Sequence, residues 1–196
     1  YDKNGAPGAS NDIASGWAFQ HSVSPGPADV IVSSSEELER ALRTAEPGDH
    51  ILLMPGAYPV RGTSIKITRA GRADAPIFLR APKFGDVTLE LTMLEGLHVR
   101  APYWVFENLV IRGNCKSDRH CEHAFHVVGG AHSTVIRNVM ALNFNAAIKV
   151  NRLRDAIPDF GLIEDSFLAN EWPRHTVRPV TPIDIVAASG WRVTSN

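Results

Sequence analysis

The sequence predicts an all-β protein, and within that class a right-handed parallel β-helix with one N-terminal capping α-helix. Two observations support this prediction. Short runs rich in β-branched residues, each bounded by turn residues, fill most of the chain after one amphipathic helical segment. A pattern of an aliphatic residue, two other residues and then Asn or Asp also recurs at intervals of roughly 30 residues, and repeats of this length are typical of stacked solenoids.

Composition and charge argue against two classes of binding partner, nucleic acids and membranes. The chain has 196 residues, a formal net charge of −1 and a pI of about 6.8, which suits one medium globular domain. We expect no nucleic-acid partner, because nucleic-acid binding usually requires a strongly basic face. We also expect no membrane partner, since the sequence has no apolar run of roughly 18 residues.

Residues 1–28 differ in composition from the remainder. They are rich in Gly, Ser, Ala and Pro without sustained periodicity, which predicts an extended N-terminal arm. Trp17 and Phe19 are large enough to hold this arm against the body. We expect residues 29–196 to form the β-helix domain.

The segment SSSEELERALRTAEPGD predicts a helix. Ser34 can cap its first turn, and Glu37, three residues later, completes a capping box. Pro47 and Gly48 end it. Its apolar face consists of Leu38, Ala41, Leu42 and Ala45.

The repeats are expected to stack with their corner residues together. AFHVVGGAHSTVIRN (124–138) aligns with IDIVAASGWRVTSN (183–196), so each unit holds a strand, a turn of small residues, a second strand and a corner at Asn or Asp. Asn and Asp tolerate the left-handed backbone of a sharp corner, and their side chains can bond to the next rung about 4.8 Å away. The alternative is four unrelated turn residues. The predicted asparagine ladder consists of Asn108, Asn138, Asp165 and Asn196.

The two ends of the predicted solenoid differ. A solenoid end exposes unpaired backbone and apolar core, and the predicted helix is placed to cover the N-terminal end. The sequence stops at Asn196 in the middle of a rung. We therefore expect the domain to be truncated at its C-terminal end, with further rungs beyond it; the alternative is contact with another chain.

The two cysteines, Cys115 and Cys121, lie in the short polar segment GNCKSDRHCEHAF. Two cysteines that close such a loop favour a disulfide and an oxidising compartment, so we expect a secreted or periplasmic protein. The alternative is a pair of free thiols.

The same segment contains residue types that bind zinc. His120, Glu122 and His123 lie beside the two cysteines, but their spacing fits no strong zinc pattern. Along one strand, His123 and His126 should also face opposite ways. The spacing therefore assigns no metal ligand.

Three titratable residues are predicted to line up on one outer face. In AFHVVGG, AAIKVN and PIDIVAAS, the alternation of apolar residues leaves His126, Lys149 and Asp184 pointing outward on successive rungs, about 5 Å apart. Asn151 shares this face. Neighbouring charges and burial can shift the pKa values of such groups, as proton transfer requires. The alternative is an ordinary solvated strand face.

Two insertions flank this predicted face. They are NRLRDAIPDF after Lys149 and NEWPRHTVRPVT before Asp184, and solenoid insertions usually map to one binding face. Arg and Lys beside a groove suit the carboxylates or sulfates of an acidic polysaccharide, and a Trp can stack on a sugar ring. Loops made soluble by charge are the alternative. The residues concerned are Arg152, Arg154, Trp172, Arg174, His175 and Arg178.

The region of residues 29–112 resembles a known family. DVIVSSSEELERALRTAEPGDHILLMPGAY and ITRAGRADAPIFLRAPKFGDVTLE are similar to the N-terminal part of the parallel β-helix polysaccharide lyases of the chondroitinase B and alginate lyase type. The resemblance implies β-elimination on uronate polysaccharides, with a Lys as base, an Arg as acid and a Ca²⁺ ion that neutralises the substrate carboxylate. The acidic pair that precedes the Lys in the family has no counterpart before Lys149, so the Ca²⁺ ligands are not identified.

The leading hypothesis is therefore a lyase that acts on an acidic polysaccharide. Lys149 is the candidate base, with Arg174 or Arg178 as its partner and His126 and Asp184 beside it. The alternatives are a non-catalytic glycan-binding module and a structural β-helix module.

Overall fold

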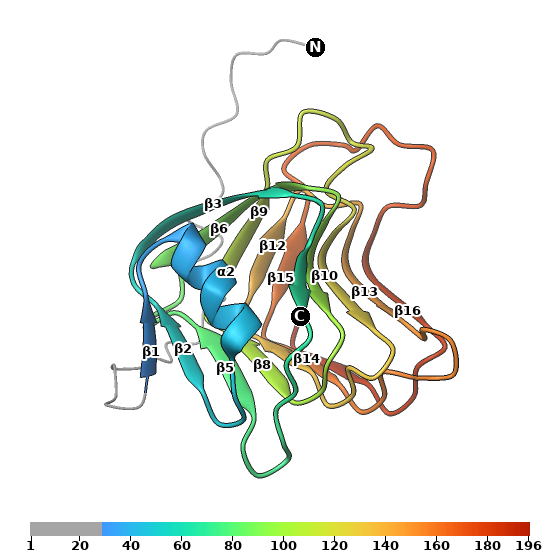
Figure 1. Cartoon of the computed structure of the whole chain (residues 1–196). Helices are drawn as coiled ribbons and strands as arrows, with labels where there is room; N and C mark the ends of the chain where they lie inside the picture. Colours follow the sequence, from blue (N-terminus) through green and yellow to red (C-terminus); the bar gives the residue numbers. More distant parts are fainter. Residues whose placement is uncertain (1–28) are drawn as a thin grey trace.

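The computed structural model describes residues 29–196, which wind into a parallel β-helix of three sheets (Figure 1). All strand pairings within the sheets are parallel, so the predicted all-β, parallel β-helix class is confirmed. The predicted arm of residues 1–28, with Trp17 and Phe19, lies outside the described residues.

Each complete rung contributes one strand to each sheet, and sheet 1 has two further strands, β1 and β17. Sheet 1 contains β1 (Asp29–Val32), β2 (His50–Leu53), β5 (Ile77–Arg80), β8 (Trp104–Glu107), β11 (Val135–Arg137), β14 (Leu162–Glu164) and β17 (Arg192–Thr194). Sheet 2 contains β4 (Ile65–Ile67), β7 (Glu95–Val99), β10 (His123–Val128), β13 (Ala146–Asn151) and β16 (Thr181–Val186). Sheet 3 contains β3 (Gly56–Gly62), β6 (Val87–Met93), β9 (Val110–Gly113), β12 (Met140–Leu142) and β15 (Phe167–Ala169).

The strands form because apolar residues alternate with polar ones at the period of a strand. In β6 every second residue of VTLELTM is buried. The inward residues of the three sheets build one continuous core. Its aromatic centre consists of Trp104, Phe106 and Phe125, all fully buried.

The predicted helix is α2 (Ser35–Thr44), and it is placed as the sequence indicates. The Ser34 side chain accepts a hydrogen bond from the Glu37 amide at 3.2 Å, and the Glu37 carboxylate accepts one from the Ser33 amide at 2.7 Å. The helix packs on β1, β3 and β4, which are the first strands of the three sheets. It therefore covers the N-terminal end of the core (Figure 1).

The corner after sheet 1 has a left-handed backbone on successive rungs. The φ angles are 61° at Asn108, 49° at Asn138 and 50° at Asp165. Asn138 donates a side-chain hydrogen bond of 2.8 Å to Oδ1 of Asn108, which is the step that the ladder hypothesis requires at these two rungs.

The placement of Asn196 at this corner is wrong by one residue. Thr194 pairs with Glu164, so Ser195, with a φ of 54°, is the residue that aligns with Asp165. The turn between β16 and β17 is one residue shorter than the turn between β10 and β11, and an alignment on Asn alone does not detect this difference. Asn196 instead accepts a hydrogen bond of 2.9 Å from the Ser166 amide.

Candidate functional site

The outer face of sheet 2 carries a row of titratable side chains. The pairing register places His126 beside Lys149 and Lys149 beside Asp184, in the order that the sequence predicts. It extends the row to His98 and then to Lys66 on the preceding rungs. The sequence reasoning missed these two residues, although SIKIT and GLHV contain the same pattern of one polar residue between apolar ones.

A break in alternation adds two more residues to this face. In β7 and β10, two buried residues follow the first residue of the strand, so Glu95 and His123 lie on the same outer side as His98 and His126. The expectation that His123 and His126 face opposite ways is wrong, because their rings meet edge to face with centroids 5.0 Å apart. Gly96 at this break leaves no room for a side chain, since a Cβ there would lie 2.5 Å from a backbone oxygen of β10.

Glu95 joins two stacked histidines. The rings of His98 and His126 lie nearly parallel, with centroids 4.9 Å apart. The Glu95 carboxylate places one oxygen 3.0 Å from Nδ1 of His126 and the other 3.4 Å from Nδ1 of His98. On its other side, Nε2 of His126 lies 2.8 Å from Oδ1 of Asn151. All of these groups are partly buried.

Burial keeps two of these histidines neutral. Desolvation lowers the pKa of His98, and the neighbouring His126 lowers it further, against a smaller opposing effect of Glu95. Desolvation also lowers the pKa of His123, partly offset by its hydrogen bond to the backbone oxygen of Ala146. At pH 7 the imidazoles of His98 and His123 are therefore uncharged.

Lys149 and Asp184 form an ion pair at the other end of the row. The distance between Nζ of Lys149 and Oδ2 of Asp184 is 2.5 Å, and the two side chains are 21% and 36% exposed. The amine is thus held at a fixed place on the surface and remains accessible to a ligand.

The insertion before β16 folds against the loop that contains the disulfide, and the two loops lie side by side at the top of Figure 1. The Cys115–Cys121 bond that the spacing predicts is present, so neither cysteine is a zinc ligand. Arg174 holds the loops together through an ion pair of 2.9 Å with Asp118 and a hydrogen bond of 2.9 Å to Asn145. Its side chain is only 2% exposed.

The two arginines that the sequence analysis proposes as the general acid differ in burial. Arg174 holds the two loops together, and its side chain is almost fully buried. Arg178 is 69% exposed and pairs with Glu122 at 3.3 Å, directly before β10. With His175 and Arg119, these two residues line an open hollow of about 610 Å³.

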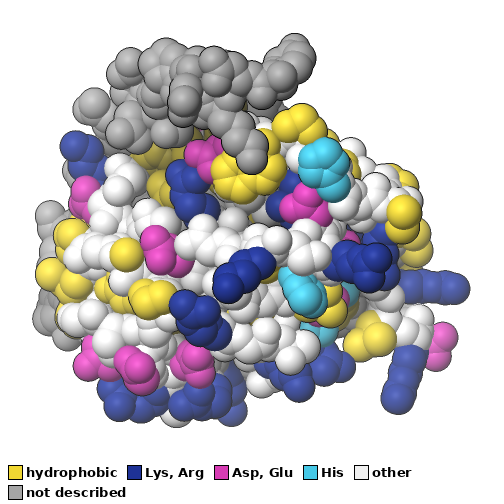
Figure 2. Space-filling view, turned by 90° about the horizontal axis from the view of Figure 1, so that it is seen from above, with side chains coloured by type: hydrophobic (Ala, Val, Ile, Leu, Met, Phe, Trp, Pro, Cys, Tyr) yellow, Lys and Arg dark blue, Asp and Glu magenta, His cyan; other side chains and the backbone are white. Residues whose placement is uncertain are grey.

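The other residues predicted to bind substrate lie on the surface. Arg152, Arg154, Trp172 and His175 are exposed, and the His175 amide donates a hydrogen bond of 2.6 Å to Asp118. On the face seen from above, His side chains lie among Lys and Arg side chains (Figure 2).

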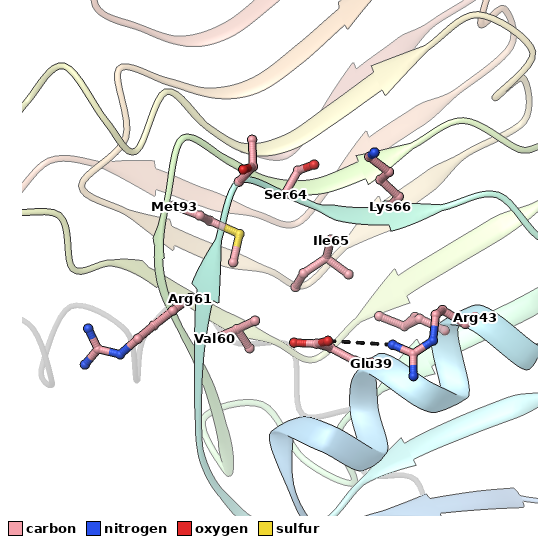
Figure 3. Close-up of a pocket in the computed structure, with 10 residues that line it drawn as sticks. Glu39, Arg43, Val60, Arg61, Ser64, Ile65, Lys66 and Met93 are labelled. Carbon is pink, nitrogen blue, oxygen red and sulfur yellow. Dashed lines mark ion pairs between the residues drawn. The ribbon is translucent and has the colours of Figure 1, made fainter.

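A second hollow lies at the N-terminal end of the row, between α2 and the strands β3 and β4 (Figure 3). Its volume is about 490 Å³, and it contains Arg61, Lys66 and the ion pair of Glu39 with Arg43 at 3.6 Å. Lys66 belongs both to this hollow and to the row. Lys66 therefore connects the row with the hollow beside the capping helix.

Glu171 anchors the insertion at its base. Its carboxylate pairs with Arg112 and accepts a hydrogen bond of 2.7 Å from the side-chain amide of Asn143. The Arg112 guanidinium is the main cause that lowers the pKa of Glu171. The ionised carboxylate is therefore the form that stabilises the loop.

Replacing Glu171 by Gln should loosen residues 170–180 in a manner that depends on pH. Because the folded-state pKa is lowered, the contribution of the carboxylate is complete above its unfolded value of roughly 4.3 and is lost as the pH falls through the lower folded value. We expect a difference of about 1 kcal/mol at pH 7, limited by partial exposure, that shrinks in acid.

Hydrogen exchange of the loop amides at a series of pH values measures this difference. Glu39→Gln removes an exposed helix pair and serves as the control, with no expected effect on the loop. A Glu171→Gln effect that is equal at every pH would contradict the assignment.

The calcium site that the resemblance implies does not fit the residues around Lys149. The side chains of Asn143 and Asn145 are already bonded to Glu171 and Arg174, and no acidic pair precedes Lys149 on its rung. Calcium requires six to eight oxygen ligands. Among residues 29–196, Glu95, His98 and His126 form the one cluster of three His, Cys, Asp or Glu side chains with metal-binding spacing, and it is rich in nitrogen.

Comparisons with known proteins agree with this architecture. A family model described as Chondroitinase B matches residues 32–154, which is more than half of the chain. Pectate lyase L of Dickeya chrysanthemi is 23% identical over 124 residues, covering 57% of this chain and 28% of that protein. Pectate lyase L of Dickeya dadantii (strain 3937) is 24% identical over the same length. The chain thus spans 28% of the length of these curated relatives.

Solved structures show the same fold. An alginate lyase from Paenibacillus sp. str. FPU-7 superposes with a TM-score of 0.57 and 20% identity, over 84% of this chain and 64% of that chain. A PL6 family polysaccharide lyase, Pedsa3628 from Pseudopedobacter saltans, superposes with a TM-score of 0.52 and 18% identity, over 85% of this chain and 41% of that one.

Proposed function

The chain belongs to the chondroitinase B family, and on this premise we propose that it forms the β-helix part of a lyase that cleaves an acidic polysaccharide by β-elimination. The observation that carries the proposal is the row on sheet 2, in which a fixed, accessible Lys149 lies among imidazole and carboxylate groups.

The reaction needs a base next to a bound uronate. The base removes the proton α to the carboxylate, the electron pair forms a double bond to the β carbon, and the bond from that carbon to the glycosidic oxygen breaks. We assign Lys149 as the base, because its amine is accessible on the outer face of sheet 2 and is held in place there. Asp184, in contact with Nζ, is its positioning residue.

The leaving oxygen must gain a proton or a strong hydrogen bond. We assign this role to Arg178, since its guanidinium is accessible and Arg174 is buried in the loop contact. His126 was predicted as catalytic, but its two ring nitrogens face Glu95 and Asn151, so it receives no proton-transfer step. Arg152, Arg154, Trp172 and His175 are exposed around the face and are proposed to contact the polymer.

The disulfide supports a secreted or periplasmic location for this function. No helix among residues 29–196 has the length and apolar character that a membrane span needs. By their names, the pectate lyases L and the Paenibacillus alginate lyase act on pectate and alginate, and this supports uronate polymers as the substrate class.

Incubation with alginate, polygalacturonate and chondroitin-type polymers tests the proposal. We expect ultraviolet absorbance to rise with one of them, because β-elimination leaves a double bond conjugated to the carboxylate. Retention on an immobilised polymer without any such product would overturn the lyase and leave a glycan-binding module.

A further inference from the structure

Glu95, His98 and His126 form a cluster that the elimination step does not use. We propose that these three side chains bind a divalent transition-metal ion, for which zinc is the best chemical match. The ligand atoms of the three residues lie within 4.8 Å of one another on two adjacent rungs of sheet 2.

The orientation of Asn151 determines which ring nitrogen of His126 donates a hydrogen bond to it. The Asn151 amide nitrogen donates a hydrogen bond of 2.9 Å to the backbone oxygen of Arg152, which can only accept. Oδ1 of Asn151 must therefore face His126, so Nε2 of His126 carries the hydrogen of that 2.8 Å bond. Nδ1 is the remaining ring nitrogen, and it lies 3.0 Å from a carboxylate oxygen of Glu95.

Nδ1 of His126 is buried. Nδ1 of His126 makes no hydrogen bond to any of the described residues, although a Glu95 oxygen lies 3.0 Å away. A carboxylate oxygen and an imidazole nitrogen at this distance can both bind one small cation. A metal ion satisfies both, and the bond from Nε2 to Asn151 is the outer-shell contact that metal-bound histidines usually make.

The spacing suits a small ion. Zinc binds histidine nitrogen and carboxylate oxygen at about 2.0–2.2 Å, so the ligand atoms of a tetrahedral site lie about 3.3 Å apart. The distances from the Glu95 oxygens to the two Nδ1 atoms are 3.0 and 3.4 Å. Calcium would require more oxygen ligands, whereas two imidazoles and one carboxylate are typical of zinc and its neighbours in the first transition row.

A set of three protein ligands leaves a coordination position open. The cluster is next to Lys149 in the pairing register, on the same outer face. If the proposed lyase function holds, the open position is available to the carboxylate of the uronate, whose charge the ion would neutralise. The binding of metal itself does not depend on that function.

Direct titration tests the proposal on protein that carries no added histidine tag and has been freed of metal with a chelator. We expect one Zn²⁺ per chain by calorimetry, a rise of the melting temperature with Zn²⁺ and little response to Ca²⁺. His98→Ala and Glu95→Gln should each weaken binding at least about 100-fold, and Asn151→Ala about 10-fold.

His132→Ala is the matched control. His132 is also partly buried, but it packs against Tyr103 outside the cluster, so its loss should leave Zn²⁺ affinity unchanged. Circular dichroism of each variant separates loss of ligand from loss of fold. Substoichiometric Zn²⁺ binding, or equal affinity in the wild type and in Glu95→Gln, would overturn the site, whatever the outcome of the lyase assay.

Discussion

Replacing Lys149 by Ala is expected to lower the kcat of the proposed lyase by roughly 10²–10⁴-fold, which is the usual contribution of a positioned base. The fold should survive, because Lys149 projects from the outer face and its loss removes one partly exposed ion pair with Asp184. KM should change much less than kcat, since the base acts on the substrate during proton removal. Initial rates of absorbance increase on the cleaved polymer measure both constants.

Two variants make this test specific. Lys149→Arg keeps the positive charge but cannot provide a neutral base, so it should be nearly as inactive as Lys149→Ala. Lys83→Ala removes an exposed lysine of another loop and should keep wild-type activity. If Lys149→Arg retains most of the activity, the side chain contributes charge and not proton transfer, and the base must be sought elsewhere.

The row that contains Lys149 was predictable because one simple rule determines it. Each of its strands has one polar residue between inward apolar residues, and parallel pairing then brings His126, Lys149 and Asp184 together. The fold class was predictable for a similar reason, since alternation, turns and a repeat of roughly 30 residues all agree. The helical cap also followed from local sequence, through Ser34 and Glu37.

The remaining parts of the site depend on departures from such rules. Glu95 and His123 lie on the outer face only because alternation breaks beside Gly96. Arg174 is buried because Asp118, far away in the sequence, lies on an adjacent loop. The turn between β16 and β17 is one residue shorter than the turn between β10 and β11, so Asn196 lies one residue past the corner. Local patterns cannot report any of these, since each depends on packing between rungs.

Replacing Phe106 by Ala should destabilise the fold by about 3–5 kcal/mol, the usual cost of truncating a fully buried Phe. The Phe106 ring is completely buried, stacked against Trp104 at 5.7 Å and edge-on to Phe125 at 5.2 Å. It therefore links the inner faces of sheets 1 and 2 directly behind the functional row. Urea unfolding followed by circular dichroism should show the midpoint falling by roughly 1–2.5 M, for a denaturant slope of about 2–3 kcal/mol/M.

A second phenylalanine, Phe160 on the surface, provides the control for the stability measurement. Phe160 is 69% exposed, so Phe160→Ala should cost no more than about 0.5 kcal/mol. Phe106→Leu should fall between the two, since it restores part of the lost volume. Because Phe125 is followed directly by His126, a cavity at Phe106 should also weaken Zn²⁺ binding by the cluster of Glu95, His98 and His126. Equal stability losses for Phe106→Ala and Phe160→Ala would show that the rungs do not share the continuous core on which the functional row depends.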